Sequence, residues 1–327
     1  MFKIGMIKLA APLILAPMAG VSDLPFRMIN RSFGCEFAFL EMINARALAY
    51  QGRKTLRMVT SIPDDKPLGI QLLGEDLQII QKAIDIIQRY DFEVIDFNAG
   101  CPVPKVTKRG EGAGLLKEPK KLIEILKFIV NHSRVPVSVK IRSGWDEDSV
   151  NAVDVALHAQ DAGIKYLFIH GRNKIQGYGG KVDYQIIRKV KEALSIPVIG
   201  SGDALSPQLI KKMFDETGCD AVTIARGALG NPWIFPQTAE FLKSGVLPPA
   251  PAPDEIADTM VKHLNLCCDY HGERIGVIVF RKFFYWYTKR IIGITPVTSK
   301  VFHSKTKEQI MDIVNELKAS NWKLCAR

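Results

Sequence analysis

Eight short, continuously apolar segments recur along the chain, and they constrain its fold more than any other feature. They are LILAPMA (13–19), FAFLEMI (37–43), LGIQLLG (68–74), VIDFNAG (94–100), VPVSVKI (135–141), YLFIHGR (166–172), IPVIGSG (196–202) and AVTIARG (221–227). Continuous apolar runs of this length are typical of parallel strands that are covered on both faces. Helical periodicity follows at 75–90, 118–132, 147–162, 183–194 and 205–217.

This alternation predicts an α/β protein, and eight repeats of it predict a closed (β/α)8 TIM barrel. An open, doubly wound sheet would carry a dinucleotide glycine fingerprint after its first strand, whereas the first predicted strand ends in APMAG (16–20).

The repeated pattern ends near Ser244. Residues 245–254 are rich in proline, which favours an extended linker. Residues 255–327 show helical periodicity without a strand pattern. The sequence therefore predicts a catalytic barrel at 1–244, a linker at 245–254 and a C-terminal all-α helical domain at 255–327. A barrel alone needs about 250 residues, so a chain of 327 has room for the second domain.

The charge balance is basic. Lys and Arg number 44 against 34 Asp and Glu, which gives a formal net charge of +10. Positive surface potential attracts phosphate backbones, so a polyanionic partner is one explanation. A solvated basic surface without such a partner is the other, and net charge alone leaves both open.

Two further features bear on location. The N-terminal apolar run is interrupted by Pro12 and Pro17 and is shorter than the roughly 20 residues of a membrane span, so we expect a buried strand and no membrane association. The six cysteines are scattered, with no CxxC pair and no His cluster at metal-ligand spacing. This predicts free thiols in a cytoplasmic protein and no bound metal.

Polar or conformationally special residues stand at the C-terminal end of nearly every predicted strand. Barrel enzymes place their chemistry there, and buried polar side chains are costly without a partner or a ligand. The residues at these ends are Pro17, Met18, Glu41, Gln71, Asn98, Lys140, Arg142, His170, Ser201, Gly202, Asp203 and Arg226. The pattern predicts an active site at this end of the barrel.

The last two strand ends, GSGD (200–203) and ARGALGNP (225–232), are rich in glycine. Glycines let backbone N–H groups approach an anion, and Arg226 adds positive charge. Phosphate binding after the seventh and eighth strands is a recurrent use of this fold. The two motifs together predict a phosphorylated cofactor or substrate.

Cys101 begins a glycine-rich and basic segment directly after the fourth predicted strand, NAGCPVPKVTKRGEGAGLL (98–116). A buried structural cysteine is the ordinary expectation for a lone thiol. A thiol that opens a mobile loop at the catalytic end of a barrel fits a chemical role better.

Six motifs together resemble the bacterial tRNA-dihydrouridine synthases. They are APMAGVSDLPFR (16–27), QLLG (71–74), NAGCP (98–102) with the following GAGLL (112–116), VKIRSGW (139–145), IHGR (169–172) and GNPWIF (230–235). The likeness runs from about Leu13 into the C-terminal domain. It implies a barrel that binds FMN, a helical tRNA-binding domain, and reduction of a uridine in the D-loop of tRNA with NADPH as the electron donor.

The resemblance also implies which residues bind FMN. The flavin ring is expected near Pro17, Met18 and Ala19, with Gln71, Lys140 and His170 at its polar edge. The phosphate is expected against Ser201, Gly202, Asp203, Ala225, Arg226 and Gly227. The family usually has Asn at the position of Ser201 and Gly at that of Ala225. Backbone contacts to phosphate survive both changes, whereas a side-chain amide contact at 201 is lost.

The remaining roles concern the uracil ring, which Asn98 and Arg142 are expected to hold. Its C5=C6 bond is conjugated to the C4 carbonyl, so hydride from the reduced flavin adds at C6 and an acid must protonate C5. By the resemblance, Cys101 is that acid, since an unperturbed cysteine is mostly protonated at neutral pH. Nearby basic residues lower a thiol pKa and an apolar pocket raises it, and the sequence leaves the outcome open.

Lys140 has two interpretations. In the family its expected role is to stabilise the anionic reduced flavin. The structural alternative is a salt bridge across the barrel mouth to Glu41.

The C-terminal domain carries a strongly basic stretch. Between Arg274 and Lys307 there are eight basic residues and no acidic one, with aromatic residues interleaved in FRKFFYWYTKR (280–290). The spacing of Phe283, Phe284 and Tyr287 predicts a buried helix face. The charges predict a surface that binds the tRNA backbone through Arg274, Arg281, Lys282, Lys289 and Arg290.

Two other functions are consistent with parts of the sequence. The first is a flavin-dependent reductase or dehydrogenase of a free pyrimidine, similar to the dihydroorotate dehydrogenases, although a free base needs no polyanion-binding domain. The second is a tRNA-binding chaperone that has lost its chemistry, which the presence of Cys101, Lys140 and His170 argues against.

Overall fold

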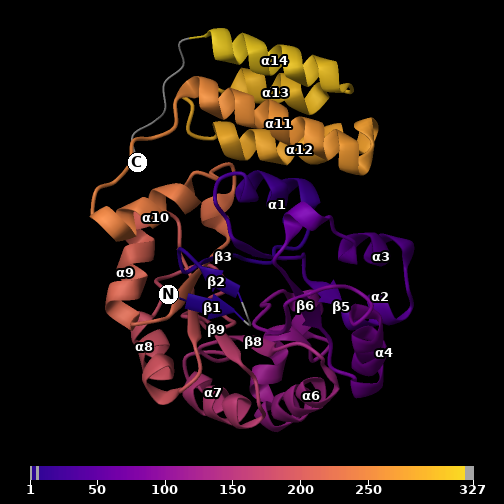
Figure 1. The fold of residues 1–327 in the computed structure, drawn as a ribbon, viewed down its shortest axis with the longest axis vertical. Helices are drawn as coiled ribbons and strands as arrows, with labels where there is room; N and C mark the ends of the chain where they lie inside the picture. Colours follow the sequence, from indigo (N-terminus) through magenta and orange to yellow (C-terminus); the bar gives the residue numbers. More distant parts are fainter. Residues whose placement is uncertain (1, 5–6, 321–327) are drawn as a thin grey trace. The chain divides into compact units, whose positions relative to one another are not determined.

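The computed structural model describes residues 2–4 and 7–320, and by packing it divides into two compact units (Figure 1). The barrel unit comprises Met1–Asp23 and Cys35–Ala225, and the helical unit comprises Leu24–Gly34 and Arg226–Arg327. These units reflect contacts within the chain. The functional boundaries at 244 and 255 stay a prediction.

Eight parallel strands close into a ring in the barrel unit. They are β3 (Leu13–Leu15), β4 (Phe37–Phe39), β6 (Leu68–Leu73), β7 (Val94–Ala99), β8 (Val137–Arg142), β9 (Tyr166–His170), β10 (Val198–Ser201) and β11 (Ala221–Ile224). Each pairs in parallel with its neighbour, and β11 pairs with β3 to close the ring. A two-residue strand, β5 (Ile43–Asn44), adds a short pairing to β6. The predicted (β/α)8 fold is confirmed.

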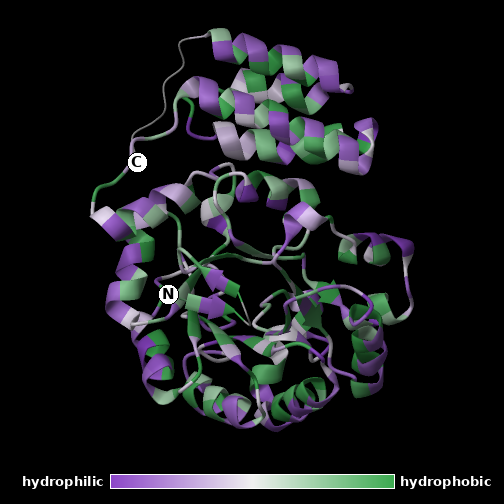
Figure 2. Ribbon diagram, in the orientation of Figure 1, coloured by the Kyte–Doolittle hydropathy of each residue, from purple (hydrophilic) through white to green (hydrophobic). Residues whose placement is uncertain are grey.

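Helices follow the strands, as the periodicity predicted. The helices of the barrel unit are α2 (Ala45–Ala49), α3 (Arg53–Val59), α4 (Leu77–Ile87), α5 (Pro104–Thr107), α6 (Pro119–His132), α7 (Ala152–Asp161), α8 (Tyr184–Ala193) and α9 (Pro207–Thr217), with 3-10 turns η1 (Pro63–Asp65) and η2 (Gly112–Lys117). The longer ones are amphipathic, and Figure 2 shows both hydrophobic and hydrophilic residues on α6 and α7.

Several helices begin later than the periodicity predicted, because N-caps precede them. The side chains of Asp76, Asp183 and Ser206 accept hydrogen bonds from backbone N–H groups in the first turns of α4, α8 and α9. The segment before α7 is not helical, since Gly144 and Val150 form an antiparallel bridge there.

An N-terminal hairpin, β1 (Phe2–Ile4) and β2 (Ile7–Leu9), was not predicted. Its Ile4 and Leu9 belong to a buried cluster with Ile14, Phe37 and other residues near the N-terminal ends of the barrel strands. The hairpin therefore fills this end of the barrel with apolar side chains. Strands of three residues are too short to produce a recognisable alternation.

Gly69 on β6 makes room for an aromatic ring inside the barrel. A Cβ atom at this position would lie 2.4 Å from Cε1 of Phe39. Phe39 packs edge-to-face against Phe37 and Phe168, with ring centroids 5.4 and 5.6 Å away. A side chain at 69 would have to displace this cluster.

The helical unit contains α1 (Leu24–Arg31), η3 (Arg226–Ala228), α10 (Ile234–Ser244), α11 (Pro253–His271), α12 (Glu273–Thr288), α13 (Thr295–His303) and α14 (Lys307–Ala319). Phe283, Phe284 and Tyr287 are buried, which confirms the predicted buried face of α12. Phe26 of α1 stacks on Phe283 with ring centroids 5.6 Å apart. The α1 segment therefore packs with the C-terminal helices, although it lies between β3 and β4 in the sequence.

Among the described residues, none of the helices combines the length and the apolarity that crossing a membrane requires.

Candidate active site

Alternation along the strands collects polar side chains inside the barrel. Residues two apart on a strand share a face, and strand register places Gln71 beside Asp96 and Asn98 beside Lys140. The polar residues of β6 to β10 gathered in this way are Gln71, Asp96, Asn98, Ser138, Lys140, Arg142, His170 and Ser201. Apolar residues such as Val94 and Phe168 occupy interior positions toward the N-terminal end of the barrel.

Asp96 anchors a buried group of hydrogen bonds. Its Oδ2 accepts from Nε2 of Gln71 at 2.6 Å, and its Oδ1 accepts from Oγ of Ser138 at 2.7 Å. Oε1 of Gln71 accepts from Nδ2 of Asn98 at 2.7 Å. Oδ1 of Asn98 accepts from the backbone N–H of Cys101 at 2.8 Å and of Gly100 at 3.1 Å. We call these residues the Asp96 network.

Lys140 places a buried ammonium in the barrel interior. Within the described residues its Nζ makes no hydrogen bond. Burial holds the pKa of Lys140 below its ordinary value, while the carboxylate of Asp96 opposes this shift. The alternative salt bridge to Glu41 is not formed, since Glu41 instead accepts a hydrogen bond from the backbone N–H of Gly20. A buried ammonium that makes no hydrogen bond within the described residues suits an anionic or carbonyl group of a ligand.

Cys101 is half-buried at the C-terminal end of β7. Burial raises the pKa of the Cys101 thiol, and the backbone N–H of Val103 and the charge of Arg142 oppose the rise only in part. The sequence left open whether the pKa of Cys101 is raised or lowered, and in the structure it is raised, which favours the protonated thiol. A thiol that stays protonated at neutral pH can act as an acid.

We expected a mobile, glycine-rich loop after Cys101, whereas the structure has helical turns in this segment. The segment forms α5 and η2, and the residues Gly112–Leu116 are buried. Gly112 has φ +58°, and a Cβ there would lie 2.9 Å from the carbonyl oxygen of Cys101. The glycines therefore allow the segment to pack closely against Cys101. The backbone N–H of Ala113 donates to that same carbonyl at 3.1 Å.

Arg142 is buried and donates to backbone carbonyls. Its Nε donates to Gly100 at 2.7 Å, and its Nη1 donates to Asn173 at 2.9 Å and Gly177 at 2.8 Å. The guanidinium also lies 5.6 Å from the ring centroid of Tyr178. Arg142 therefore holds the segments after β7 and β9 together, and its contact with uracil stays a prediction.

His170 is buried at the end of β9. Its Nδ1 accepts a hydrogen bond from the backbone N–H of Arg172 at 3.2 Å. A neutral His170 therefore carries its proton on Nε2 and can donate from that atom.

The predicted phosphate loop after β10 has the backbone of an anion-binding turn. Gly202 has φ +125° and Asp203 has φ +48°, an uncommon left-handed conformation for a residue other than glycine. Arg172 stabilises this turn, because its Nη1 and Nη2 donate to the two carboxylate oxygens of Asp203 at 3.0 and 2.6 Å. Because the carboxylate of Asp203 is already paired with Arg172, we expect a phosphate to contact residue 203 through its backbone N–H.

The other expected FMN residues lie in turns. Pro17 and Met18 are half-buried and Ala19 is exposed, in a turn where Oγ of Ser22 accepts from the backbone N–H of Met18 at 2.9 Å. Ala225 follows β11, while Arg226 and Gly227 form part of η3 in the helical unit.

Sequence reasoning missed Asp96, Ser138 and Arg172. A usable signal existed for the first two: each stands two residues before a predicted site residue, on the same face of an otherwise apolar strand. Arg172 lies within the IHGR motif, but its bidentate pairing with Asp203 depends on tertiary structure.

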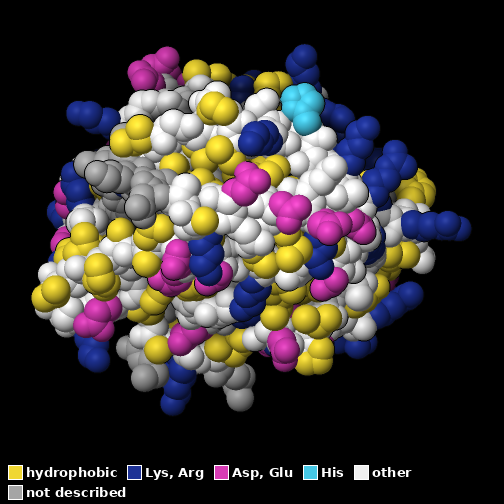
Figure 3. Space-filling view, turned by 90° about the horizontal axis from the view of Figure 1, so that it is seen from above, with side chains coloured by type: hydrophobic (Ala, Val, Ile, Leu, Met, Phe, Trp, Pro, Cys, Tyr) yellow, Lys and Arg dark blue, Asp and Glu magenta, His cyan; other side chains and the backbone are white. Residues whose placement is uncertain are grey.

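The basic residues predicted to bind the tRNA backbone differ in their exposure to solvent. Arg274 and Lys289 are exposed, while Lys282 and Arg290 are half-buried. Arg281 is half-buried too, and its Nη2 donates to the carbonyl of Ser304 at 2.7 Å. Figure 3 shows several Lys and Arg side chains toward the right edge of the view and others scattered over the same face. Contact of these residues with RNA stays a prediction.

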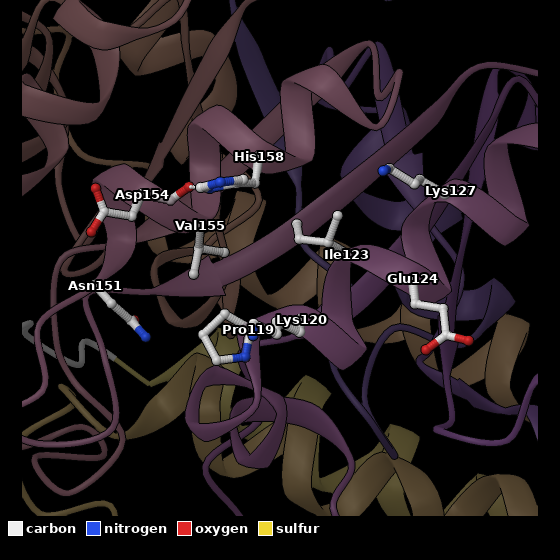
Figure 4. Close-up of a pocket in the computed structure, with 9 residues that line it drawn as sticks. All are labelled: Pro119, Lys120, Ile123, Glu124, Lys127, Asn151, Asp154, Val155 and His158. Atoms are coloured by element: carbon white, nitrogen blue, oxygen red, sulfur yellow. Dashed lines mark hydrogen bonds between the residues drawn. The ribbon is translucent and has the colours of Figure 1, made fainter.

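A hollow of about 550 Å³ lies between α6 and α7 (Figure 4). It is lined by Pro119, Ile123, Val155, His158 and their neighbours, and no predicted site residue borders it.

Five cysteines are free thiols: Cys35, Cys101, Cys219, Cys267 and Cys268. Cys325 lies outside the described residues. Within residues 2–4 and 7–320, no group of three or more His, Cys, Asp or Glu side chains is arranged to hold a metal ion.

Comparison with known proteins agrees with the motifs. The family model described as Dihydrouridine synthase (Dus) matches residues 14–321. The chain is 38% identical over 292 residues to the tRNA-dihydrouridine synthase B of Pseudomonas aeruginosa, which covers 89% of this chain and 88% of the relative. It is 39% identical over 287 residues to the protein of the same name from Vibrio parahaemolyticus, covering 88% and 89%.

A solved structure shares the fold. The old yellow enzyme homologue of Zymomonas mobilis matches with a TM-score of 0.55 and 12% identity, over 76% of this chain and 92% of that chain. At this identity the likeness concerns the fold alone.

Proposed function

The chain belongs to the dihydrouridine synthase family, and from that premise we propose that it reduces a uridine in the D-loop of tRNA to 5,6-dihydrouridine, with FMN as its cofactor and NADPH as the electron donor. The reaction is an oxidoreduction of the C5=C6 bond. We place it in the cytoplasm. The observation that carries the proposal is the buried ammonium of Lys140, which makes no hydrogen bond among the described residues and lies at the barrel end that also holds the Cys101 thiol.

The residues of the barrel interior fit a flavin. Lys140 offers its positive charge, Gln71 and His170 offer donors from the same interior, and the turn at Gly202 and Asp203 offers backbone N–H groups to a phosphate. When bound there, reduced FMN supplies the hydride that adds to C6 of the uracil ring.

Cys101 supplies the proton that C5 then requires. Its raised pKa keeps the thiol protonated at neutral pH, so the proton is present when the substrate arrives. Asn98 fixes the backbone at Cys101, and Arg142 ties that backbone to the segment after β9. The backbone that carries the thiol is thus held by hydrogen bonds to side chains of β7 and β8.

The substrate in this proposal is RNA rather than a free pyrimidine. A uridine inside folded tRNA has to be extruded from its stack before it can react, and this requires binding to the surrounding backbone. The exposed Arg274 and Lys289 on and beside α12 supply suitable charge. A free base needs no such surface.

The test is mass spectrometry of nucleosides from tRNA that lacks dihydrouridine, after incubation with the purified protein and NADPH. We expect a gain of two hydrogens on one uridine, mapped by nuclease fragments, and no reduction of free uridine. A yellow protein whose flavin is reduced by NADPH but which leaves tRNA unchanged would overturn the proposal and favour a free pyrimidine.

A further inference from the structure

The proposed reaction gives no role to Asp96, although it is the most deeply placed carboxylate of the site. Its side chain is 2% exposed, and both of its oxygens accept hydrogen bonds. A buried carboxylate is costly to maintain, and burial raises the pKa of Asp96 above its ordinary value. Packing alone would be served better by an apolar residue of similar volume.

The Asp96 network has a fixed direction. A carboxylate accepts hydrogen bonds, so the Nε2 group of Gln71 must face Asp96 and its Oε1 must face Asn98. Oε1 needs a donor, so Nδ2 of Asn98 must face Gln71, and Oδ1 of Asn98 then faces the backbone. The backbone N–H groups of Gly100 and Cys101 can only donate, so they require the same orientation from the other end.

We propose that Asp96 is a positioning residue that acts through the side-chain amides of Gln71 and Asn98 to hold the backbone of Cys101 for proton transfer. The inference rests on the proposed role of Cys101 as the acid. An amide at position 96 would offer Gln71 a donor as well as an acceptor. The orientation of both side-chain amides would then be enforced only from the backbone end, and Oδ1 of Asn98 would be held less firmly against the backbone N–H of Cys101.

A different role for Asp96 is to balance the charge of Lys140. The two roles separate when the network is cut without changing the charge. Gln71→Met removes the link between Asp96 and Asn98 and leaves the carboxylate in place. Asp96→Asn removes both the anchor and the charge. If positioning is the role, both variants loosen the backbone of Cys101; if charge balance is the role, Gln71→Met leaves that backbone unchanged.

Two further variants complete the set. Ser138→Ala removes the other hydrogen bond to Asp96 and leaves the path to Cys101 intact, so it is the matched control. The double variant Asp96→Asn/Gln71→Glu transfers the carboxylate from position 96 to position 71, its hydrogen-bond partner in the network. The carboxylate introduced at position 71 accepts from the amide introduced at position 96 and from the side chain of Asn98, so the orientation of Asn98 is again enforced from both ends.

The direct readout is the exchange rate of the Cys101 backbone amide in the full-length, flavin-bound protein. Selective ¹⁵N-cysteine labelling makes the signal visible, and its loss in Cys101→Ser assigns it. We expect exchange about tenfold faster in Asp96→Asn and Gln71→Met, as for the loss of one hydrogen bond. Ser138→Ala should stay within about twofold of the wild type, and the double variant should recover most of the protection.

The kinetic readout is a single turnover of tRNA by the pre-reduced protein, measured apart from reduction of the flavin by NADPH. We expect the tRNA step to slow about tenfold in Asp96→Asn. Gln71→Met also removes a proposed flavin contact, so this variant is judged by the exchange of the Cys101 amide. Unchanged Cys101 exchange in Gln71→Met overturns the proposal, and so does a double variant that is worse than Asp96→Asn alone. If Asp96→Asn does not fold, Gln71→Met decides. A wild type inactive on tRNA would refute the proposed function, whereas the exchange measurement still tests the network.

Discussion

The interior of the barrel and the surface of α12 hold their polar side chains in opposite ways. In the interior, the side chains of the Asp96 network each have protein partners at hydrogen-bond distance. On and beside α12, Arg274 and Lys289 are exposed to solvent. Proton transfer requires fixed geometry, whereas attraction of a polyanion requires only charge within reach. Single changes in the interior should therefore cost far more than single changes on the surface.

The largest effect is expected from Cys101→Ala. Dihydrouridine formation should fall by about 10²- to 10⁴-fold, because the general acid is lost. Flavin absorbance and tRNA affinity should stay at wild-type values, since the thiol binds neither partner in the proposed mechanism. Nucleoside mass spectrometry over a time course measures the rate. Cys268→Ala in α11 is the control, and wild-type turnover in Cys101→Ala would remove the thiol from the mechanism.

The next largest effect concerns the charge of Lys140. Its pKa is lowered by burial, so the ammonium should lose its proton below the ordinary lysine value of about 10.4. The charged form is present at low pH and lost as pH rises, so flavin reduction by NADPH should slow with rising pH in this range. Stopped-flow absorbance across pH measures it.

Lys140→Met tests this assignment. At neutral pH its flavin reduction should be about tenfold slower, the loss of one favourable charge interaction, and the alkaline decline should vanish. A decline that persists in Lys140→Met would assign the titration to another group.

A smaller effect is expected from Arg274→Ala combined with Lys289→Ala. Binding of tRNA should weaken several-fold, and the slope of log Kd against log salt should fall by roughly 1 to 2, in proportion to the charges removed. Filter binding over a salt series measures both. Lys318→Ala in the same unit is the control, since Lys318 is paired with Asp258 at 2.6 Å. An unchanged slope in the double variant would mean that RNA docks elsewhere.

The smallest effect is expected from Arg281→Ala. Nη2 of Arg281 donates to the carbonyl of Ser304, so its loss should lower the free energy of unfolding by about 1 kcal/mol. Urea denaturation followed by tryptophan fluorescence measures this change. Arg274→Ala should leave the unfolding curve in place. Equal stability of Arg281→Ala and the wild type would return Arg281 to the set of residues available for RNA.

The sequence predicted the architecture well because the barrel repeats one local pattern eight times. Each apolar strand and each amphipathic helix can be recognised from its own residues, and the buried face of α12 follows from periodicity in the same way. The N-terminal hairpin escaped because its strands have only three residues. The segment after Cys101 was misjudged because its glycines permit tight packing as well as mobility.

The site was predictable only in part. Strand ends identify Gln71, Asn98 and Lys140, and the alternation of side chains could have added Asp96 and Ser138. Their hydrogen bonds depend on register between strands that are about 25 to 40 residues apart, which the local sequence does not encode. The direction of the Cys101 pKa shift likewise depends on burial by distant segments.

The space that Gly69 leaves for the ring of Phe39 limits the order in which substitutions at these two positions can accumulate during evolution. The ring of Phe39 occupies the volume that a side chain at 69 would need. A larger residue at one of the two positions therefore requires a smaller residue at the other. Enlarging residue 69 first would push on the strand that carries Gln71, two residues further along. Shrinking residue 39 first would open a cavity that a later side chain at 69 could fill. A lineage or a mutant library should therefore acquire a smaller residue at 39 before a larger one at 69. Variants with a larger residue at 69 alone should be lost because they are destabilised.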